Sequence, residues 1–567
     1  MRKKWGNRIG AIVLACALTM SGLPVQSIST STRKAYAAAK SETEKQDVSQ
    51  PETKMGNVVL NGNDIAVNNV NGLTYKGFGM LSGNSTSDLL MDYKAEQPKA
   101  YAELMQYLFG GNYPIMNHVK LEMGNDRNTS TGPESCTKRT EKEKANVLRN
   151  PGWQLAADAK KIHPKIKVSI LRWEAPVWAG TDEKIYQWYK ETILDAYEKY
   201  GYMVDYINPN INEKWDVDSD VAFTKKFAKW IAAETKETIP DEKALALYHK
   251  IKLVVSDEAG TASDSVVESM KSDSDFYNSV DVVGYHYSPW DDSNGGMKWL
   301  AQTKDKEVWN SEAQATFSNS AFRPSNNVKD PTTEGTGLGG TGSALEMANT
   351  FIKGFVQSRR SHVIYQPAIG SFYEGAQFSF KELVGARDPW SGWIHYDAGL
   401  LMLAHISKFA VTGWENEDNT AGIWRAVPQA SKCTADGTNP VNGRNGGENY
   451  MTLASPAKDN FSTMIVNDSE YPMEYKIQTK NMKLAEDQNL EIWETRAADD
   501  GAFNENYMKC IGTAKADDNG VYTVKVKPYS AVTVTTLQVA DDEEHTKALP
   551  VEGERTVLDT DLSLIHI

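Results

Sequence analysis

Apolar and polar positions follow two different rhythms along the chain, and the change falls near residue 400. Before it, short apolar runs alternate with longer segments in which apolar residues return every three or four positions. A short apolar run is typical of a buried parallel strand, and the longer spacing is typical of an amphipathic helix. Eight runs predict strands: 77–81, 118–123, 167–171, 202–211, 252–255, 280–287, 307–309 and 362–369.

The segments between these runs predict the helices that would cover the sheet. They are 99–109, 152–161, 185–200, 220–235, 263–272, 297–304 and 343–359. Strand and helix repeated in this way indicate an α/β fold, a (β/α)8 TIM barrel over residues 76–400. Because the seventh run is very short, a doubly wound sheet stays open as the alternative fold.

Beyond residue 400 the pattern changes to short segments with strict alternation, separated by Asp, Asn, Gly and Pro. The segments are 450–454, 460–466, 473–478, 490–494, 520–526 and 530–538. Such a pattern favours an accessory β-sandwich over residues 401–545, which strands within 57–75 could join. The polar stretch 38–56 predicts a linker before them.

Both ends of the chain carry segments that we expect to lie outside the fold. A basic start, an apolar run at 9–23 and the small-x-small triplet ending at Ala37 predict a signal peptide over 1–37. An uncleaved anchor, or a lipoprotein modified at Cys16, is the alternative. We expect a secreted or cell-surface protein with no integral membrane segment in the mature chain. The final LSLIHI of the tail 546–567 resembles a translated sequencing adapter, so we expect the natural reading frame to continue.

Composition narrows the classes of partner and cofactor. The 567-residue chain has a formal net charge of −14, which argues against nucleic acid or an anionic membrane surface as the main partner. Besides Cys16, the cysteines are sparse and widely spaced, and no metal, phosphate-loop or dinucleotide motif is present. We therefore expect no cofactor and no metal, while Cys433 and Cys510 could pair. The oligomeric state stays open.

Two glutamates follow predicted strands at positions that suit sugar chemistry. Glu213 comes after the fourth run, directly behind Asn212, and Glu312 comes after the seventh. Barrel enzymes carry their catalytic groups at the C-terminal strand ends, and glycoside cleavage normally uses a pair of carboxyl groups. We predict that Glu213 and Glu312 face each other across the barrel mouth, Glu213 as acid/base and Glu312 as nucleophile. Asn212 could bind the sugar 2-hydroxyl.

The chain resembles the galactocerebrosidase (galactosylceramidase) family, glycoside hydrolase family 59. The stretches that carry the resemblance run in family order through the predicted barrel: GFGMLSG at 77–83, YLF at 107–109, KLEMGND at 120–126, TGPES at 131–135, LRWEAPVW at 171–178, INE at 211–213, VVSD at 254–257, DVVGYHY at 281–287, WNSE at 309–312, FYE at 372–374 and DPWSG at 388–392. The resemblance implies a retaining exo-β-galactosidase that acts on galactosylceramide or a related β-galactoside glycolipid or glycan.

By position, the resemblance assigns roles to single residues. Glu213 resembles the family's proton donor and Glu312 its nucleophile. The substrate-binding candidates are Asn212, Trp173, His286, Tyr287, Gly79, Thr129, Tyr365 and Arg387. Most of these have a plainer interpretation as packing or hydrogen-bonding residues of the core.

The chain also departs from the family pattern where the sugar should be read. Tyr365-Gln366 stands where the family has Trp-Asn, Ala313 replaces an Asp, and no Arg occurs at 378–380, so that Arg387 is the nearest candidate. The family's lectin-like domain and its calcium site have no counterpart in this sequence, in keeping with a frame that continues. These departures leave the reaction type in place and the galactose and ceramide preference open.

Two other functions stay open at this point. A related barrel-plus-sandwich glycosidase, such as a β-glucosylceramidase or a β-xylanase relative, would share the carboxyl pair. A non-catalytic carbohydrate-binding protein could have kept the same fold. The presence of both Glu213 and Glu312 favours an enzyme.

Overall fold

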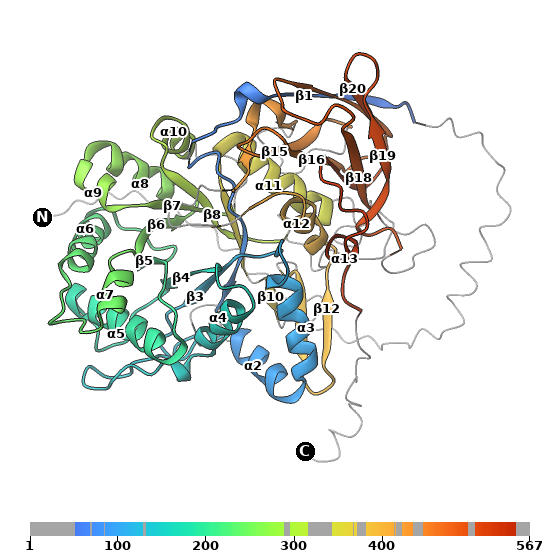
Figure 1. Cartoon of the computed structure of the whole chain (residues 1–567). Helices are drawn as coiled ribbons and strands as arrows, with labels where there is room; N and C mark the ends of the chain where they lie inside the picture. Colours follow the sequence, from blue (N-terminus) through green and yellow to red (C-terminus); the bar gives the residue numbers. More distant parts are fainter. Residues whose placement is uncertain are drawn as a thin grey trace, which may run out of the picture. The chain divides into compact units, whose positions relative to one another are not determined.

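Eight parallel strands close into a barrel in the computed structural model (Figure 1). The structure describes residues 51–68, 71–83, 86–128, 132–287, 295–315, 343–366, 368–370, 382–412, 414, 422–434, 446–496 and 505–551. The barrel strands are β2 (Gly77–Ser82), β3 (His118–Glu122), β4 (Lys167–Arg172), β5 (Tyr206–Ile211), β6 (Lys252–Glu258), β7 (Val282–His286), β8 (Glu307–Ala313) and β9 (His362–Tyr365). Because β9 pairs with β2, the sheet closes, so the barrel prediction is confirmed and the doubly wound alternative is wrong.

Helices surround this barrel and follow its strands in sequence (Figure 1). They are α2 (Thr86–Glu96), α3 (Pro98–Phe109), α4 (Pro151–Ile162), α5 (Asp182–Tyr200), α6 (Val217–Ala233), α7 (Glu242–Tyr248), α8 (Thr261–Ser272), α9 (Ser274–Ser279), α10 (Gly296–Thr303) and α11 (Ala344–Ser358). Local chemistry sets several of their ends. Thr181 caps α5 by accepting a hydrogen bond from the Lys184 N–H, and Gly201 ends the same helix with φ 77°.

Side chains of each barrel strand alternate between the barrel interior and the helix layer. On β9, Ile364 belongs to the interior cluster with Trp309 and Trp414. Val363 and Tyr365 belong to the large core between the barrel and its helices. This alternation decides which polar side chains can reach the barrel mouth.

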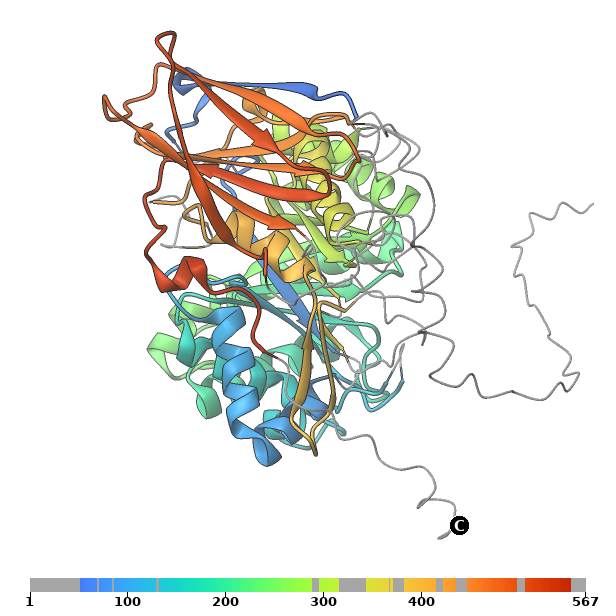
Figure 2. The ribbon, with the colours of Figure 1, turned by 90° about the vertical axis from the view of Figure 1, so that its right-hand side faces the viewer.

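The second layer is a β-sandwich that takes in strands from both ends of the chain. One sheet is β1 (Lys54–Asn61), β17 (Met473–Lys480) and β20 (Val521–Val526). The other is β13 (Arg425–Ala426), β14 (Lys432–Cys433), β15 (Asn449–Ala454), β16 (Phe461–Asn467), β21 (Ser530–Thr535), β18 (Asn489–Arg496) and β19 (Lys509–Lys515). Figure 2 shows blue β1 beside the orange and red strands, which agrees with its parallel pairing to β17. β1 begins at Lys54, inside the predicted linker.

Helix α12 (Gly399–Ser407) spans the predicted boundary between residues 400 and 401. All nine of its residues are buried, since it packs between barrel and sandwich. His405 fixes it there, with Nδ1 at 2.9 Å from Thr533 Oγ1 and Nε2 at 2.8 Å from Thr495 Oγ1. One hydrophobic cluster therefore spans barrel and sandwich, and a second lies within the sandwich.

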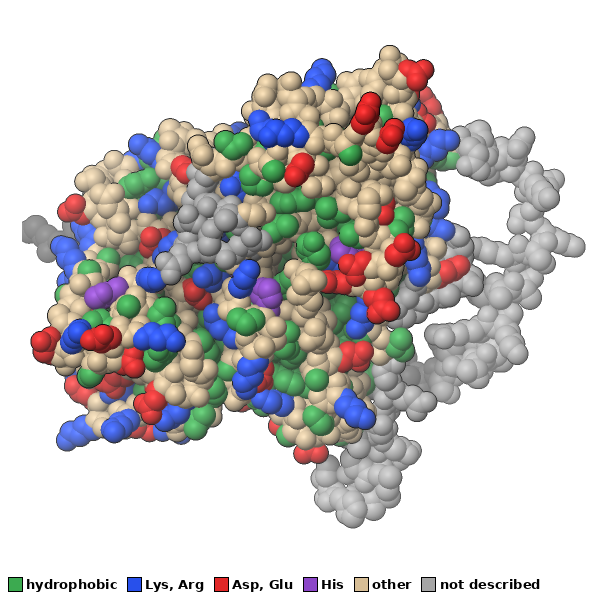
Figure 3. All heavy atoms as spheres, viewed as in Figure 1, with side chains coloured by type: hydrophobic (Ala, Val, Ile, Leu, Met, Phe, Trp, Pro, Cys, Tyr) green, Lys and Arg blue, Asp and Glu red, His purple; other side chains and the backbone are tan. Residues whose placement is uncertain are grey.

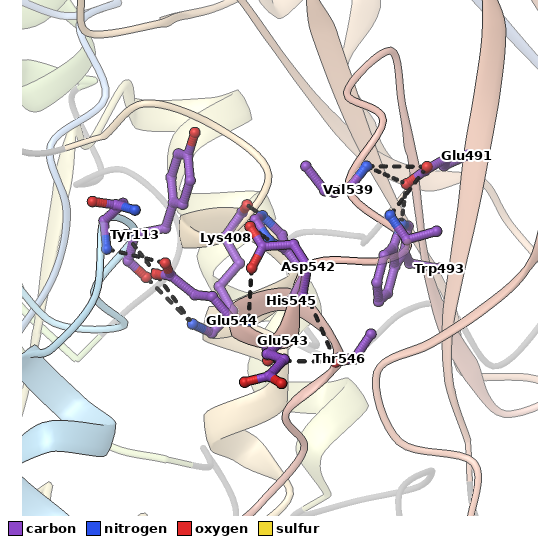
Figure 4. A network of polar contacts seen from close by, with 12 residues as sticks. Tyr113, Lys408, Glu491, Trp493, Val539, Asp542, Glu543, Glu544, His545 and Thr546 are labelled. Atoms are coloured by element: carbon purple, nitrogen blue, oxygen red, sulfur yellow. Dashed lines mark hydrogen bonds and ion pairs between the residues drawn. The ribbon is translucent and has the colours of Figure 1, made fainter.

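A second seam joins the barrel to the segment after the last strand (Figure 4). In α13 (Glu543–Thr546), Glu544 Oε1 accepts a hydrogen bond from the Tyr113 N–H at 2.8 Å. His545 Nε2 lies 2.6 Å from the Lys408 carbonyl oxygen. Residues 542–546 thus tie the C-terminal segment to the loop before β3 and to the end of α12.

Several sequence expectations concern residues outside the described ranges. These are the signal peptide at 1–37, residues 38–50 of the linker and residues 552–567 of the tail. No helix within the described ranges has the length and apolar character that a membrane crossing requires. Figure 3 shows basic and acidic side chains interspersed over one face, so the net negative charge is not gathered there.

A third, small sheet is formed by β10 (Ile369–Gly370), β11 (Val384–Asp388) and β12 (Trp393–Tyr396).

Candidate active site

The backbone is strained where three neighbouring barrel strands end. Glu213 has φ 57° and follows β5, and its N–H donates to the Asp257 carbonyl oxygen at 3.2 Å. Ser256 and Asp257 near the end of β6 have φ 74° and 48°, and Tyr287 after β7 has φ 58°. Left-handed conformations of non-glycine residues cost about 1–3 kcal/mol each and cluster at functional sites. Their concentration at the C-terminal end of the barrel marks this end as the site.

The two predicted carboxyl groups meet at this end. A carboxylate oxygen of Glu213, one of Glu312 and a ring nitrogen of His286 lie within 4.8 Å of one another. The Glu312 side chain is 3% exposed, and the Tyr287 hydroxyl donates a hydrogen bond to its Oε1. The Glu213 side chain is 39% exposed. One carboxylate is therefore enclosed and the other faces the open mouth.

β8 is longer than its apolar letters suggested. The predicted strand stopped at Trp309, whereas the structure continues it to Ala313 and so includes Glu312. Pairing with β7 and β9 shifts register within this extension, where His286 pairs with Glu312. Such irregularities re-aim side chains next to active sites, and here the result is that Glu312 points toward His286.

His286 connects the two glutamates. Its Nδ1 lies 3.1 Å from Glu213 Oε1 and 3.9 Å from Glu312 Oε2, and its Nε2 lies 3.4 Å from Asp257 Oδ1. Burial lowers the pKa of His286, but Glu312, Asp257 and Glu213 outweigh burial and raise the pKa to about 9. At neutral pH the ring is therefore charged and both of its nitrogens are donors.

Behind His286 lies a buried ion pair that sequence reasoning missed. The Lys120 Nζ on β3 is 3.1 Å from Asp257 Oδ2, and the Asn208 amide donates to the same oxygen at 2.8 Å. Burial raises the pKa of Asp257, but Lys120 and the hydrogen bond from His286 bring that pKa below its usual value. The signal was present in the sequence, since a lysine inside an otherwise apolar strand needs a buried carboxylate.

Glu258, the last residue of β6, was also missed. Its Oε1 accepts a hydrogen bond at 2.6 Å from the Trp215 N–H, in the segment that follows Glu213. Burial and the nearby negative charges of Glu213 and Asp257 outweigh the hydrogen bond and His286, and raise the pKa of Glu258 to about 7. Glu258 thus supports the turn that presents Glu213.

Asn212 and Trp173 lie at neighbouring strand ends, as their assignment requires. The Asn212 N–H donates to the Arg172 carbonyl oxygen at 2.9 Å, which joins the end of β5 to the end of β4. The Asn212 side chain is fully buried, and neither amide atom has a hydrogen-bond partner among the described residues. Trp173 follows β4 and belongs to the interior cluster. A buried amide without a partner is costly, and a bound ligand would satisfy it.

Two of the proposed substrate contacts lie elsewhere. Tyr365 is directed into the helix layer, where its ring centroid is 6.4 Å from that of Phe78, so it cannot reach the mouth. Gly79 lies deep in the interior, where a side-chain carbon would stand 2.8 Å from His118 Cβ. Both assignments followed linear position, whereas alternation along a strand decides the direction of a side chain such as that of Tyr365.

The remaining two candidates are Arg387 and Thr129. Arg387 is buried on β11 of the small sheet, outside the barrel strands, with its guanidinium 5.2 Å from the centre of the Trp393 ring. Thr129 lies outside the described residues.

Glu213, His286 and Glu312 also form the group, within the described part of the chain, whose ligand atoms come close enough to share a metal ion. A metal needs the lone pair of a neutral imidazole. In this structure His286 Nδ1 lies 3.1 Å from Glu213 Oε1, so hydrogen bonding holds the ring to this carboxylate.

Comparison with known families and curated proteins agrees with this geometry. A family model described as Glycosyl hydrolase family 59 matches residues 75–408, more than half of the chain. The galactocerebrosidase of Danio rerio is 25% identical over 357 residues, which cover 60% of this chain and 46% of that protein. The Homo sapiens galactocerebrosidase is 27% identical over 350 residues, which cover 60% and 44%. The chain thus spans about half the length of these relatives.

Solved structures share the fold at low identity. SrfJ from Salmonella typhimurium matches with a TM-score of 0.56 and 12% identity, covering 87% of this chain and 94% of that one. The catalytic domain of GH30 xylanase C from Talaromyces cellulolyticus matches with a TM-score of 0.55 and 12% identity, covering 84% and 99%. At this identity the likeness extends to the architecture of a barrel with added β-sheets.

Proposed function

The chain belongs to glycosyl hydrolase family 59, and from that premise we propose that it is a retaining exo-β-galactosidase of the galactosylceramidase type. One observation carries the proposal: carboxylate oxygens of Glu213 and Glu312 lie within 4.8 Å of each other at the barrel mouth. Retaining glycosidases hold their carboxyl groups about 5–5.5 Å apart, whereas inverting enzymes leave about 6.5–9.5 Å for a water. The spacing supports double displacement.

In the first half of the reaction, the Glu312 carboxylate attacks the anomeric carbon while Glu213 gives its proton to the glycosidic oxygen. The bond to the aglycone breaks and a covalent galactosyl ester forms on Glu312. In the second half, Glu213 as carboxylate takes a proton from water, and the water oxygen attacks the anomeric carbon. Glu312 is released, and the sugar keeps its configuration.

The environments of the two groups support these roles. Enclosed Glu312 accepts a hydrogen bond from Tyr287 and has His286 beside it, which holds its carboxylate in one orientation, as a nucleophile requires. Half-open Glu213 can reach both a leaving oxygen and an entering water. Asn212 would bind the 2-hydroxyl, where hydrogen bonds strengthen in the transition state, and Trp173 would line the sugar.

The substrate is proposed as a terminal β-galactoside, in galactosylceramide or a related glycoconjugate. Support comes from the relatives, which are galactocerebrosidases, at about one-quarter identity. The chain departs from the family pattern at Tyr365-Gln366, where the family has Trp-Asn, so the sugar preference needs a direct test. The N-terminal segment supports a further proposal that the protein acts outside the cell or at its surface.

Covalent trapping tests the proposal directly. A 2-fluoro-β-galactoside with a dinitrophenyl leaving group should inactivate the enzyme, and mass spectrometry should find the fluorogalactosyl group on Glu312. Glu307→Gln, a change at the opposite end of the barrel, is the matched control and should still be labelled. Label on another residue would overturn the assignment of the nucleophile.

A substrate panel tests the sugar. Aryl β-galactoside, β-glucoside and β-xyloside should be compared by kcat/KM under the same conditions, with galactosylceramide in detergent as the lipid substrate. We expect the galactoside to be preferred. Preference for the glucoside or xyloside, with label still on Glu312, would keep the mechanism and overturn the galactose assignment.

A further inference from the structure

Among the described residues, the barrel interior contains two buried lysine–carboxylate pairs, of which one contacts His286. Lys76 pairs with Glu307 near the strand starts. Lys120 pairs with Asp257 at 3.1 Å, and Asp257 reaches His286 Nε2 with its other oxygen at 3.4 Å. A buried charge pair contributes little net stability, so stability does not explain why the Lys120–Asp257 pair lies beside His286.

The local backbone is built to present Asp257. Ser256 and Asp257 both have left-handed φ values, and the pairing of β6 with β7 shifts register between Ser256 and Glu258. A straight strand would place Asp257 on the face opposite its two neighbours in sequence. At this irregular end of β6 the Asp257 carboxylate contacts Lys120, Asn208 and His286.

We propose that Asp257, anchored by Lys120 and Asn208, is a positioning residue that keeps both ring N–H groups of His286 in place and aimed at the carboxyl pair. This inference rests on the proposed function of Glu213 and Glu312. Asp257 touches neither substrate nor a reacting atom. It acts through the imidazole, whose Nδ1 lies 3.1 Å from Glu213 and 3.9 Å from Glu312.

The charged and titratable groups around His286 determine what removal of Asp257 would do. Glu213 follows β5, Asp257 and Glu258 belong to β6, Tyr287 follows β7, and Glu312 belongs to β8. Without Asp257, the ring loses the partner of Nε2 and its pKa falls from about 9. A neutral ring no longer offers a positive charge to the two carboxylates, which lie 3.1 Å (Glu213) and 3.9 Å (Glu312) from its Nδ1. We therefore expect both limbs of the kcat/KM profile to move to higher pH.

The test compares two matched substitutions. Asp257→Asn removes one buried carboxylate beside His286, and Glu307→Gln removes the other, near the strand starts. With an aryl β-galactoside, Asp257→Asn should lower kcat/KM on the order of 10–100-fold and move its pH limbs upward, as loss of an outer-layer partner does elsewhere. Glu307→Gln should leave the pH limbs unchanged. An Asp257→Asn profile that keeps its limbs, or moves them downward, would overturn the proposal.

A second measurement separates this inference from the proposed function. In protein labelled with nitrogen-15 at histidine, the His286 ring, assigned with His286→Gln, should titrate at lower pH in Asp257→Asn than in wild type. This readout needs no substrate, so failure of galactoside turnover and failure of the Asp257 role give different results. If Asp257→Asn does not fold, Lys120→Met/Asp257→Asn removes both buried charges and should show the same histidine shift; an unshifted ring there would overturn the role.

Discussion

The strand starts and the strand ends of this barrel both bury a lysine, a carboxylate and histidine. The pKa of the buried histidine is lowered at the strand starts and raised at the strand ends. Near the starts, which we call the floor, His118 Nδ1 lies 2.9 Å from His362 Nε2. Burial, followed by the charge of Lys76, lowers the pKa of His362 to about 3 despite hydrogen bonds to the backbone. At the mouth, three carboxylates overcome the same burial and raise the pKa of His286 to about 9.

The difference lies in which charges face the ring. At the floor, a lysine and a second imidazole face the ring of His362, so the neutral ring is the more stable form there. Its carboxylate is paired: Glu307 accepts from Lys76 and, at 2.6 Å, from Trp309 Nε1. The mouth combines strained backbone with an Asn212 amide that lacks a partner among the described residues. One end is arranged for stability and the other for binding.

The largest expected effect is on catalytic rate and concerns a residue of the mouth. Glu312→Gln should lower kcat for an aryl β-galactoside on the order of 10⁴-fold or more, because an amide cannot form the glycosyl ester. Thermal unfolding should change little, since the glutamine oxygen can still accept from Tyr287. Turnover within tenfold of wild type would leave a carbohydrate-binding protein, or a different nucleophile, as the better account.

The next effect is on stability and belongs to the floor. Glu307→Gln leaves Lys76 buried without its carboxylate, and breaking a buried pair costs about 3–5 kcal/mol of unfolding free energy. Urea unfolding measures this loss, while kcat per folded molecule should stay close to that of wild type. A loss of kcat as large as that of Glu312→Gln would show that the floor takes part in catalysis and would end the comparison.

The fold could be predicted because its strands and helices are local patterns repeated in order. The extension of β8 could not, since Asn310, Ser311 and Glu312 are polar letters that only tertiary packing places in a strand. Glu213 and Glu312 were found because strand ends are visible in sequence. Their partner Asp257 was missed because direction around a register shift depends on the neighbouring strands.

The one-residue parity of a strand explains the misassigned substrate contact on β9. Tyr365 occupies the position that the family comparison assigned to the sugar, but its neighbour Ile364 is the residue that faces the interior. Sequence alone places a residue on a strand more securely than on a face of it. The buried polar contacts of this site, in contrast, could not be predicted from the sequence pattern.

The two ends should also lose stability at opposite ends of the pH range. His362 has a lowered pKa, so the stability that depends on its neutral form is lost as pH falls from about 6.5 toward 3. His286 has a raised pKa, so its contribution is present below about pH 6.5 and lost as pH rises through 9. Urea unfolding should show a loss of about 3–5 kcal/mol across each window, since each pKa unit corresponds to about 1.4 kcal/mol.

Single substitutions assign each slope. His286→Gln should flatten the alkaline loss and leave the acid loss, while His362→Gln should reduce the acid loss, to which His118 also contributes, and leave the alkaline loss. Either variant flattening both slopes would mean that the two histidines titrate as one system. That result would contradict the separation of floor from mouth.

The smallest effect is on stability and concerns two buried asparagines. Substitution should lower stability at the floor and leave it unchanged or raise it slightly at the mouth. Asn117 at the floor donates to the Lys76 carbonyl oxygen at 2.7 Å, so Asn117→Ala should cost about 1–2 kcal/mol of stability and leave kcat unchanged. Asn212→Ala removes a buried amide without a described partner and should leave stability unchanged or raise it slightly.

Asn212→Ala should instead lower kcat/KM for the galactoside about 10–100-fold, because a hydrogen bond that strengthens in the transition state is lost. The matching substrate control is a 2-deoxygalactoside, on which variant and wild type should differ little. An equal loss on both substrates would place Asn212 away from the 2-hydroxyl. Loss of stability in Asn212→Ala comparable to that of Asn117→Ala would show that its amide is satisfied within the protein, and the mouth would then resemble the floor.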